Sequence, residues 1–216
     1  MNKETVGNSP RRIYRDLELQ PAGETRGLRR MLSIIIATLD SENELASSLV
    51  ALVPGAMDGL VTEVIVADGG SGDGTATVAD VAGCNFAVIQ GPSGRRLKAA
   101  AATARAPWLL FLQPGTVPEP AWTGEVRRFV ERAPPDARAA VFRRGRATRP
   151  VLKELLSLAT VALGALPRPE QGLLIARPFY DELGGHSDLA ADPETDLIRR
   201  IGRRRMVTLA TGAAPR

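Results

Sequence analysis

The amino-acid sequence predicts a single α/β domain in which helices flank a mostly parallel sheet. Short apolar runs, typical of buried strands, alternate with segments that carry apolar residues at helical spacing. Such alternation is typical of parallel strands joined by crossover helices. A glycine-rich turn directly follows one of the runs, and open α/β sheets bind ligands at such strand ends. The 216 residues, of which 44% are hydrophobic, suffice for one domain with a substantial core.

Residues 1–30 are expected to form a disordered N-terminal extension, which leaves 31–216 as the domain. The segment is polar and aperiodic and lacks the apolar stretch of a secretory signal, and Met31 is an alternative start. It holds seven basic and four acidic residues, so the domain keeps only about +1 of the net charge of +4. Without a pattern of stacking aromatic residues, this charge gives no indication of nucleic-acid binding.

The first elements alternate as strand, helix and strand. Residues 32–36 form an apolar run that predicts a strand. Residues 42–53 carry leucines at helical spacing, and Pro54-Gly55 should end this helix. The elements expected next are a strand at 64–67, a helix at 75–81 and a strand at 86–89.

The remaining elements follow the same reasoning. The alanine-rich segment 97–105 predicts a helix, and 108–112 predicts a buried strand that ends in the turn 113–116. Segment 121–132 again has a helical period. Beyond Pro134-Pro135 we expect a strand at 139–142, a helix at 155–166, a strand at 173–176, and helices at 178–183 and 194–201.

The longest near-apolar run, 155–166, is too short to cross a membrane and is expected to be a core or interface helix. Upstream lies a basic cluster of four arginines: Arg143, Arg144, Arg146 and Arg149. It would suit anionic lipid or a diphosphate, although a solvated surface is the simpler interpretation.

The most informative motif is an apolar strand that ends on Asp68 and enters the glycine-rich turn 69–74. A carboxylate at the end of such a strand is well placed to meet a ribose or a base. The alternative is an aspartate that only forms the turn. Asp73 stands where its side chain would cap the next helix, so a structural role is favoured for it.

Three cations, Arg95, Arg96 and Lys98, stand at the start of a predicted helix. The helix dipole disfavours cations there, so an anionic ligand such as a diphosphate is the favoured explanation and a solvated face the alternative. The only cysteine, Cys84, excludes an internal disulfide and a cysteine-based zinc site. It is expected to lie inert in the core.

For three other conspicuous side chains, a structural role is the simpler explanation. His186 follows two glycines and is more simply a loop or capping residue than a ligand. Trp108 and Trp122 are most simply core residues.

Several of these segments together resemble family 2 glycosyltransferases of the GT-A fold. They are 33–40, the turn after Asp68, 94–96, 108–112 and 170–175, in order along 32–207. Small bacterial members of the arsenosugar-biosynthesis type are the most similar. The resemblance implies a Rossmann-like GT-A domain that transfers a sugar, with inversion, from a nucleotide-diphosphate-sugar donor to a hydroxyl acceptor. The single cysteine favours a cytoplasmic protein, with peripheral contact at the inner face of the membrane left open.

The resemblance also implies roles for particular residues. Donor-binding roles fall on five side chains, with the first three at the nucleoside and the last two at the diphosphate: Thr38, Asp40, Asp68, Arg95 and Arg96. The half of the chain beyond Pro134-Pro135 would form the acceptor side, where Gln171 and Gly172 suit a close approach of backbone to the acceptor. A plain turn before a strand explains this pair almost equally well.

Glu194 is the candidate catalytic base, because the family places its base just before an arginine-rich helix. Its carboxylate would accept the proton of the acceptor hydroxyl while the anomeric carbon develops oxocarbenium character. Asp192 and Asp196 remain candidates, since the register is open by a residue or two. A carboxylate that only complements the helix dipole is the structural alternative.

The chain departs from the family at the Asp-x-Asp motif that usually holds Mg²⁺ or Mn²⁺. Here the residues are Gln113-Pro114-Gly115, and an amide with backbone carbonyls would hold such a cation weakly. A metal is therefore expected to bind weakly or not at all. The departure raises an alternative function, a degenerate GT-A domain that binds nucleotide or nucleotide-sugar without transfer. A dinucleotide-dependent oxidoreductase does not fit, because 69–74 lacks the Gly-x-Gly-x-x-Gly spacing and follows the second strand.

Overall fold

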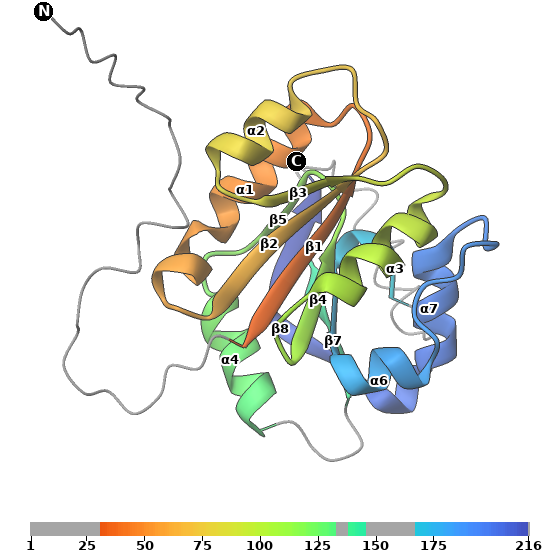
Figure 1. Ribbon diagram of the computed structural model, residues 1–216. Helices are drawn as coiled ribbons and strands as arrows, with labels where there is room; N and C mark the ends of the chain where they lie inside the picture. Colours follow the sequence, from red (N-terminus) through yellow and green to blue (C-terminus); the bar gives the residue numbers. More distant parts are fainter. Residues whose placement is uncertain (1–30, 133–137, 146–166, 216) are drawn as a thin grey trace, which may run out of the picture.

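Eight strands form one sheet in the computed structural model, which describes residues 31–132, 138–145 and 167–215 (Figure 1). Across the sheet the order is β3-β2-β1-β4-β7-β6-β8-β5. The strands are β1 Leu32–Thr38, β2 Val61–Asp68, β3 Asn85–Val88, β4 Trp108–Leu112, β5 Thr116–Pro118, β6 Ala139–Arg144, β7 Leu173–Ala176 and β8 Met206–Pro215. Strands β3, β2, β1 and β4 are parallel, and β7 pairs antiparallel with β4.

Helices cover both faces of the sheet (Figure 1). They are α1 Glu42–Met57, α2 Thr75–Val81, α3 Ser93–Thr103, α4 Trp122–Arg132, α6 Arg177–Glu182 and α7 Pro193–Ile201, with 3₁₀ turns η2 Pro169–Gln171 and η3 Arg203–Arg205. Because side chains alternate along a strand, Ile34 packs with α1 and α4, while Ile35 packs with α3, α6 and α7. Strands β1, β2 and β4 are thus buried on both faces, which explains their nearly continuous apolar sequence, whereas β3 at the edge of the sheet is largely exposed.

The predicted alternation of strands and helices is confirmed for the described residues, but some helix ends differ. Helix α3 runs over Ser93–Thr103 rather than 97–105. Pro54-Gly55 does not stop α1, which continues to Met57. The last turn is closed by the Asp58 N–H on the Pro54 carbonyl at 2.9 Å. A Cβ at Gly55 would lie 2.5 Å from the Trp122 ring, so glycine is what lets this turn pack on α4. The predicted segments 1–30 and 155–166 lie outside the described residues.

The side chains expected in the core occupy it. Trp122 is fully buried, and Trp108 packs edge-on against Phe129 with ring centroids 5.5 Å apart. Cys84 packs against the same core, and burial raises the pKa of its thiol to about 12, which keeps it unreactive. No helix in the described part of the chain is both long and apolar enough to cross a membrane.

Candidate functional site

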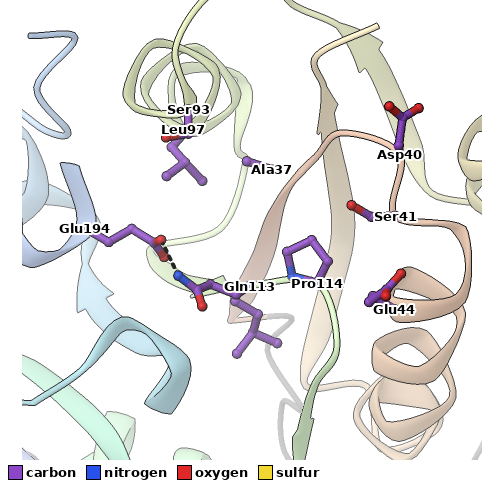
Figure 2. A pocket seen from close by; sticks show the side chains of 10 residues that line it. Ala37, Asp40, Ser41, Glu44, Ser93, Leu97, Gln113, Pro114 and Glu194 are labelled. Atoms are coloured by element: carbon purple, nitrogen blue, oxygen red, sulfur yellow. Dashed lines mark hydrogen bonds between the residues drawn. The ribbon is translucent and has the colours of Figure 1, made fainter. Parts of the chain in front are cut away.

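A pocket of about 410 Å³ opens where β1 and β4 end and α1, α3 and α7 begin (Figure 2). Its walls are formed by Ala37, Asp40, Ser41, Glu44, Ser93, Leu97, Leu112, Gln113, Pro114 and Glu194. The carboxyl ends of parallel strands meet at this edge of the sheet, where open α/β sheets bind their ligands. Crossover connections bring the helix N-termini to the same edge, so the topology itself creates the pocket.

The first turns of three helices line this pocket. Ser41 and Glu44 come from the start of α1, Ser93 from the start of α3, and Glu194 from the start of α7. The N-terminus of a helix carries unpaired N–H groups and the positive end of the dipole, which favour a bound anion. The lining itself holds three carboxylates and no cationic side chain. Helix N-termini therefore supply the positive electrostatic contribution of the wall.

Glu194 and Gln113 meet in this pocket, although they lie 81 positions apart in the sequence (Figure 2). The Gln113 amide Nε2 donates to Glu194 Oε2 at 2.7 Å. Burial raises the pKa of Glu194, and the charges of Asp192 and Glu170 raise it further, while the hydrogen bond from Gln113 opposes the rise. A carboxylate of raised pKa is a stronger proton acceptor, as a general base requires.

The two other candidates for the base are engaged elsewhere. Asp192 caps α7 by accepting the Thr195 N–H at 3.0 Å. Asp196 pairs with Arg200 at 2.8 Å, one turn along the same helix. Glu194 is the member of this acidic group that lines the pocket.

The end of β4 places Gln113 at the pocket. Gly115, with φ 85°, turns the chain, and its N–H donates to the Glu44 carbonyl at 3.0 Å. From below, the Gly172 backbone approaches so closely that a Cβ there would lie 2.6 Å from a Leu112 methyl group. Gly172, with φ 68°, thus brings its backbone against β4, the strand that leads to Gln113, and it does not line the pocket.

Asp40 sits on a strained turn at the opposite side of the pocket (Figure 2). Its φ of 46° lies in the left-handed region, which aspartate tolerates better than most residues. Its N–H donates to Ser71 Oγ at 2.8 Å, and its Oδ1 accepts the Gly72 N–H at 2.7 Å. The loop after β1 is thus tied to the glycine-rich loop after β2.

Asp68 is buried beneath these two loops rather than exposed in the pocket. Its carboxylate accepts hydrogen bonds from the Thr38 hydroxyl at 2.7 Å, from the Gly70 and Ser71 N–H groups at 2.8 and 2.7 Å, and from Ser71 Oγ at 2.5 Å. Burial disfavours its charge, but these hydrogen bonds outweigh burial and hold the pKa of Asp68 below its usual value. Four donors occupy the four lone-pair positions of an ionised carboxylate.

Asp73 takes the structural role predicted for it, because Oδ1 accepts the Thr75 N–H at 3.0 Å and Oδ2 accepts the Glu42 N–H at 3.0 Å. It therefore joins the starts of α1 and α2. Ser71, which links Asp68 to Asp40, was not predicted from the sequence. A hydroxyl three residues after a strand-end carboxylate is the feature that would have suggested it.

The remaining predicted residues lie beside the pocket rather than in its wall. Arg95 is exposed, and Arg96 donates to the Gly91 carbonyl at 2.9 Å while its guanidinium lies against Gly69. Gln171 donates to the Phe142 carbonyl at 2.7 Å and accepts the Arg168 N–H at 2.9 Å, so both ends of its amide hold η2.

His186 lies in the loop after α6, as expected, with its ring fully buried. Its Nδ1 and the Tyr180 hydroxyl are 2.9 Å apart, and the ring packs edge-on against Phe111. Burial lowers the pKa of His186 to about 3, and the charge of Arg200 contributes to the decrease. The side chain is therefore neutral at physiological pH and belongs to the core.

The residues of the pocket do not form a set suited to a divalent cation. In 31–132, 138–145 and 167–215, no group of three or more His, Cys, Asp or Glu side chains is placed to hold one. Mg²⁺ and Mn²⁺ prefer several oxygen ligands. At the position where the Asp-x-Asp motif was expected, the amide presents an N–H to Glu194 instead.

Comparisons with known proteins bear on the family and the fold of the chain. The model of the family described as glycosyl transferase family 2 matches residues 33–167. A glucosyl-3-phosphoglycerate synthase from Mycobacterium tuberculosis, solved with Mn²⁺ and UDP-glucose, is similar with a TM-score of 0.61 and 23% identity over 97% of this chain and 77% of that one. The same enzyme solved with phosphoglyceric acid gives 0.61 and 22% over 87% and 72%. None of the curated proteins matches the chain significantly.

These structural neighbours confirm the predicted GT-A architecture, a Rossmann-like and mostly parallel sheet flanked by helices. A third complex of the same enzyme, with Mn²⁺, UDP and glucosyl-3-phosphoglycerate, has a TM-score of 0.60 and 23% identity over 87% of this chain and 72% of that one.

Proposed function

The chain belongs to glycosyl transferase family 2, and we propose that it transfers a sugar from a nucleotide-diphosphate donor to a hydroxyl acceptor with inversion at the anomeric carbon. The observation that carries this proposal is Glu194, a carboxylate of raised pKa in the pocket where three helix N-termini and two strand ends meet. The pocket thus combines a base for a hydroxyl with an electrostatic environment for a diphosphate.

The reaction follows from the position of Glu194. Its carboxylate takes the proton of the acceptor hydroxyl, whose oxygen forms a bond to the anomeric carbon. The bond from that carbon to the diphosphate oxygen breaks, and its electron pair leaves with the nucleotide diphosphate. A single displacement with one base inverts the anomeric configuration. The raised pKa of Glu194 favours this proton transfer.

The donor would lie across the first turns of α1 and α3. The N–H groups at these helix starts would face the diphosphate, except that of Glu42, which Asp73 accepts, and Ser41 and Ser93 supply hydroxyl groups there. Arg95 and Arg96 stand beside this wall and would add positive charge to the leaving group. Asp40 would meet the nucleoside with the carboxylate oxygen that Gly72 does not use.

Asp68 and Thr38 would act on the nucleoside through the loops that they hold. Their mutual hydrogen bond and the bonds to Gly70 and Ser71 fix the turn on which Asp40 sits. Direct contact of Asp68 with a ribose would replace one of its present donors. On the acceptor side, Gln171 and Gly172 would support the wall of the pocket from η2.

Two of the solved complexes contain a divalent cation, Mn²⁺ with UDP in one and Mn²⁺ with UDP-glucose in the other. In this chain the described donor set does not fit such a cation, so no step of the proposed reaction passes through one. Helix N-termini and the neighbouring arginines would balance the charge of the departing diphosphate instead.

The proposal is tested by calorimetric titration of UDP-, GDP- and TDP-sugars, with and without Mn²⁺, followed by donor hydrolysis with any donor that binds. We expect metal-independent binding and slow hydrolysis that Glu194→Gln abolishes while binding persists. Glu131→Gln, at an exposed position near the end of α4, is the matched control and should behave like the wild type. Absence of binding to every nucleotide would refute the proposal.

The second candidate is a GT-A domain that binds nucleotide-sugar without transfer, and Gln113-Pro114-Gly115 is the observation that favours it. Binding and turnover separate the two functions. A donor that binds tightly but is neither hydrolysed nor transferred, in wild type and Glu194→Gln alike, would support the binding protein.

A further inference from the structure

We propose that Gln113 is a positioning residue that holds the Glu194 carboxylate through its amide and takes the place of a divalent cation at this corner of the pocket. The inference rests on the proposed role of Glu194 as the base. The hydrogen bond of 2.7 Å joins two residues on rigid elements, since Gln113 follows β4 directly and Glu194 belongs to the first turn of α7.

The chemistry of the two groups sets the orientation of the amide. An ionised carboxylate can only accept hydrogen bonds, so the atom that faces Glu194 at this distance must be the amide nitrogen and not its oxygen. One carboxylate oxygen is thereby held in place, and the other is left to receive the proton of the acceptor. Fixing the base in this way reduces the entropic cost of reaching the reactive geometry.

The same contact is incompatible with a cation between the two side chains. A cation would need an oxygen from each residue at about 2.0–2.6 Å. The nitrogen and oxygen here are already 2.7 Å apart, so the amide would have to rotate and lose its hydrogen bond before an ion could enter. A carboxylate at position 113 would instead face Glu194 with a like charge, and the pair would need a proton or a cation.

Backbone contacts on both sides of the end of β4 keep Gln113 in this position. The Gly172 backbone packs against Leu112, the residue before Gln113, and the Gly115 N–H is bonded to α1 on the other side. The amide is thus placed by its backbone and needs no metal to order it. At the position of the family's metal-binding Asp-x-Asp motif, this chain therefore has a neutral side chain that donates a hydrogen bond to the base.

Two readouts that need neither donor nor acceptor test the inference. The first is the pKa of Glu194, followed by ¹³C NMR of labelled glutamate and assigned by the signal lost in Glu194→Gln. Gln113→Leu removes the donor and should raise this pKa by roughly one unit, the size expected for a hydrogen bond to a charged group. Gln113→Asn keeps the amide but shortens its reach, and it should raise the pKa too, which covers a Leu variant that fails to fold.

The second readout is Mn²⁺ binding, followed by electron paramagnetic resonance. Gln113→Glu should bind Mn²⁺ at least tenfold more tightly than the wild type, because it creates a carboxylate pair. Asn85→Leu is the matched control, since Asn85 donates its amide to the Glu63 carboxylate at 2.9 Å on a different strand pair. It should change neither the pKa of Glu194 nor the affinity for Mn²⁺.

An unchanged pKa of Glu194 in Gln113→Leu and Gln113→Asn would overturn the inference. Tight Mn²⁺ binding by the wild type that Gln113→Leu abolishes would also overturn it, because Gln113 would then be a metal ligand. A chain that shows both expected results and yet turns over no donor would refute the proposed function while the coupling of Gln113 to Glu194 stands.

Discussion

Gly94→Ala tests whether the start of α3 holds Glu194 in place. An alanine Cβ at this position would lie 2.1 Å from the Ser187 carbonyl oxygen and 2.9 Å from the Pro193 Cβ. Contacts under 3.0 Å essentially never occur, so the loop that leads into α7 must move by roughly 1 Å, a displacement that can reduce a rate about 100-fold. Pro193 precedes Glu194 directly, so the base moves with it.

The stability effect can be worked out against a matched glycine. Replacing glycine by alanine in a helix gains up to about 1 kcal/mol, but forced overpacking costs about 1–3 kcal/mol. Gly94→Ala should therefore lower Tm by a few degrees, at about 2–4 °C per kcal/mol for a domain of this size. Gly124 in α4 has open space around its Cβ position, so Gly124→Ala should raise Tm.

The assays are thermal unfolding and donor hydrolysis with the two variants side by side. We expect Gly94→Ala to stay folded and lose about 100-fold in turnover, while Gly124→Ala turns over donor like the wild type. If Gly94→Ala matches the wild type in both Tm and turnover, the packing of α3 on the loop before Glu194 does not position the base.

Three further predictions concern the loops and the core. Ser71→Ala removes the hydroxyl between Asp40 and Asp68 and should weaken donor binding about fivefold by calorimetry, which corresponds to a loss of about 1 kcal/mol in binding free energy. An unchanged Kd would argue against a positioning role. The folded pKa of His186, about 3, lies below the ordinary 6.5, so the unfolded chain binds the proton first as pH falls. The free energy of unfolding should decrease below pH 6.5 by about 1.4 kcal/mol per pH unit, and the total loss should approach about 5 kcal/mol near pH 3. Urea unfolding at several pH values measures this dependence, and His186→Leu should reduce the slope of the unfolding free energy against pH. Because His186 is the only histidine, an unchanged slope would contradict its assignment to this side chain. Gly172→Ala would place a Cβ at a φ of 68° and 2.6 Å from a side chain of β4. It should lower the free energy of unfolding, measured in urea, by about 2 kcal/mol or more. An unchanged free energy would mean that the backbone after η2 can shift at little cost.

The sequence predicted the parallel half of the sheet because three of its strands, β1, β2 and β4, are buried on both faces and read as continuous apolar runs. Strand β8 lacks such a run: it contains threonine, alanine and glycine, and several of its residues are exposed. Strand β5 has three residues and includes a proline. Neither has a local pattern strong enough to predict a strand. Strand β8 forms by pairing with β6, and β5 forms by pairing with β8.

The candidate site was predictable in its parts but not in its contacts. The resemblance to the family pointed to Asp40 and Glu194, and the topology brings both to one edge of the sheet, because Asp40 follows a strand and Glu194 begins a helix. The hydrogen bond between Gln113 and Glu194 joins residues 81 positions apart, and no local pattern contains that information. The burial of Asp68 was equally hidden, since a strand-end aspartate has the same sequence whether it faces a ligand or holds a loop.

The most direct test of the account is NMR of the sugar released or transferred from a donor that binds. Wild type should convert an α-linked donor into a product that is β at first observation, and Glu194→Gln should bind the donor with similar affinity and give no product. A product that retains the donor's configuration would contradict the single displacement. Full turnover by Glu194→Gln would contradict the assignment of Glu194 as the base.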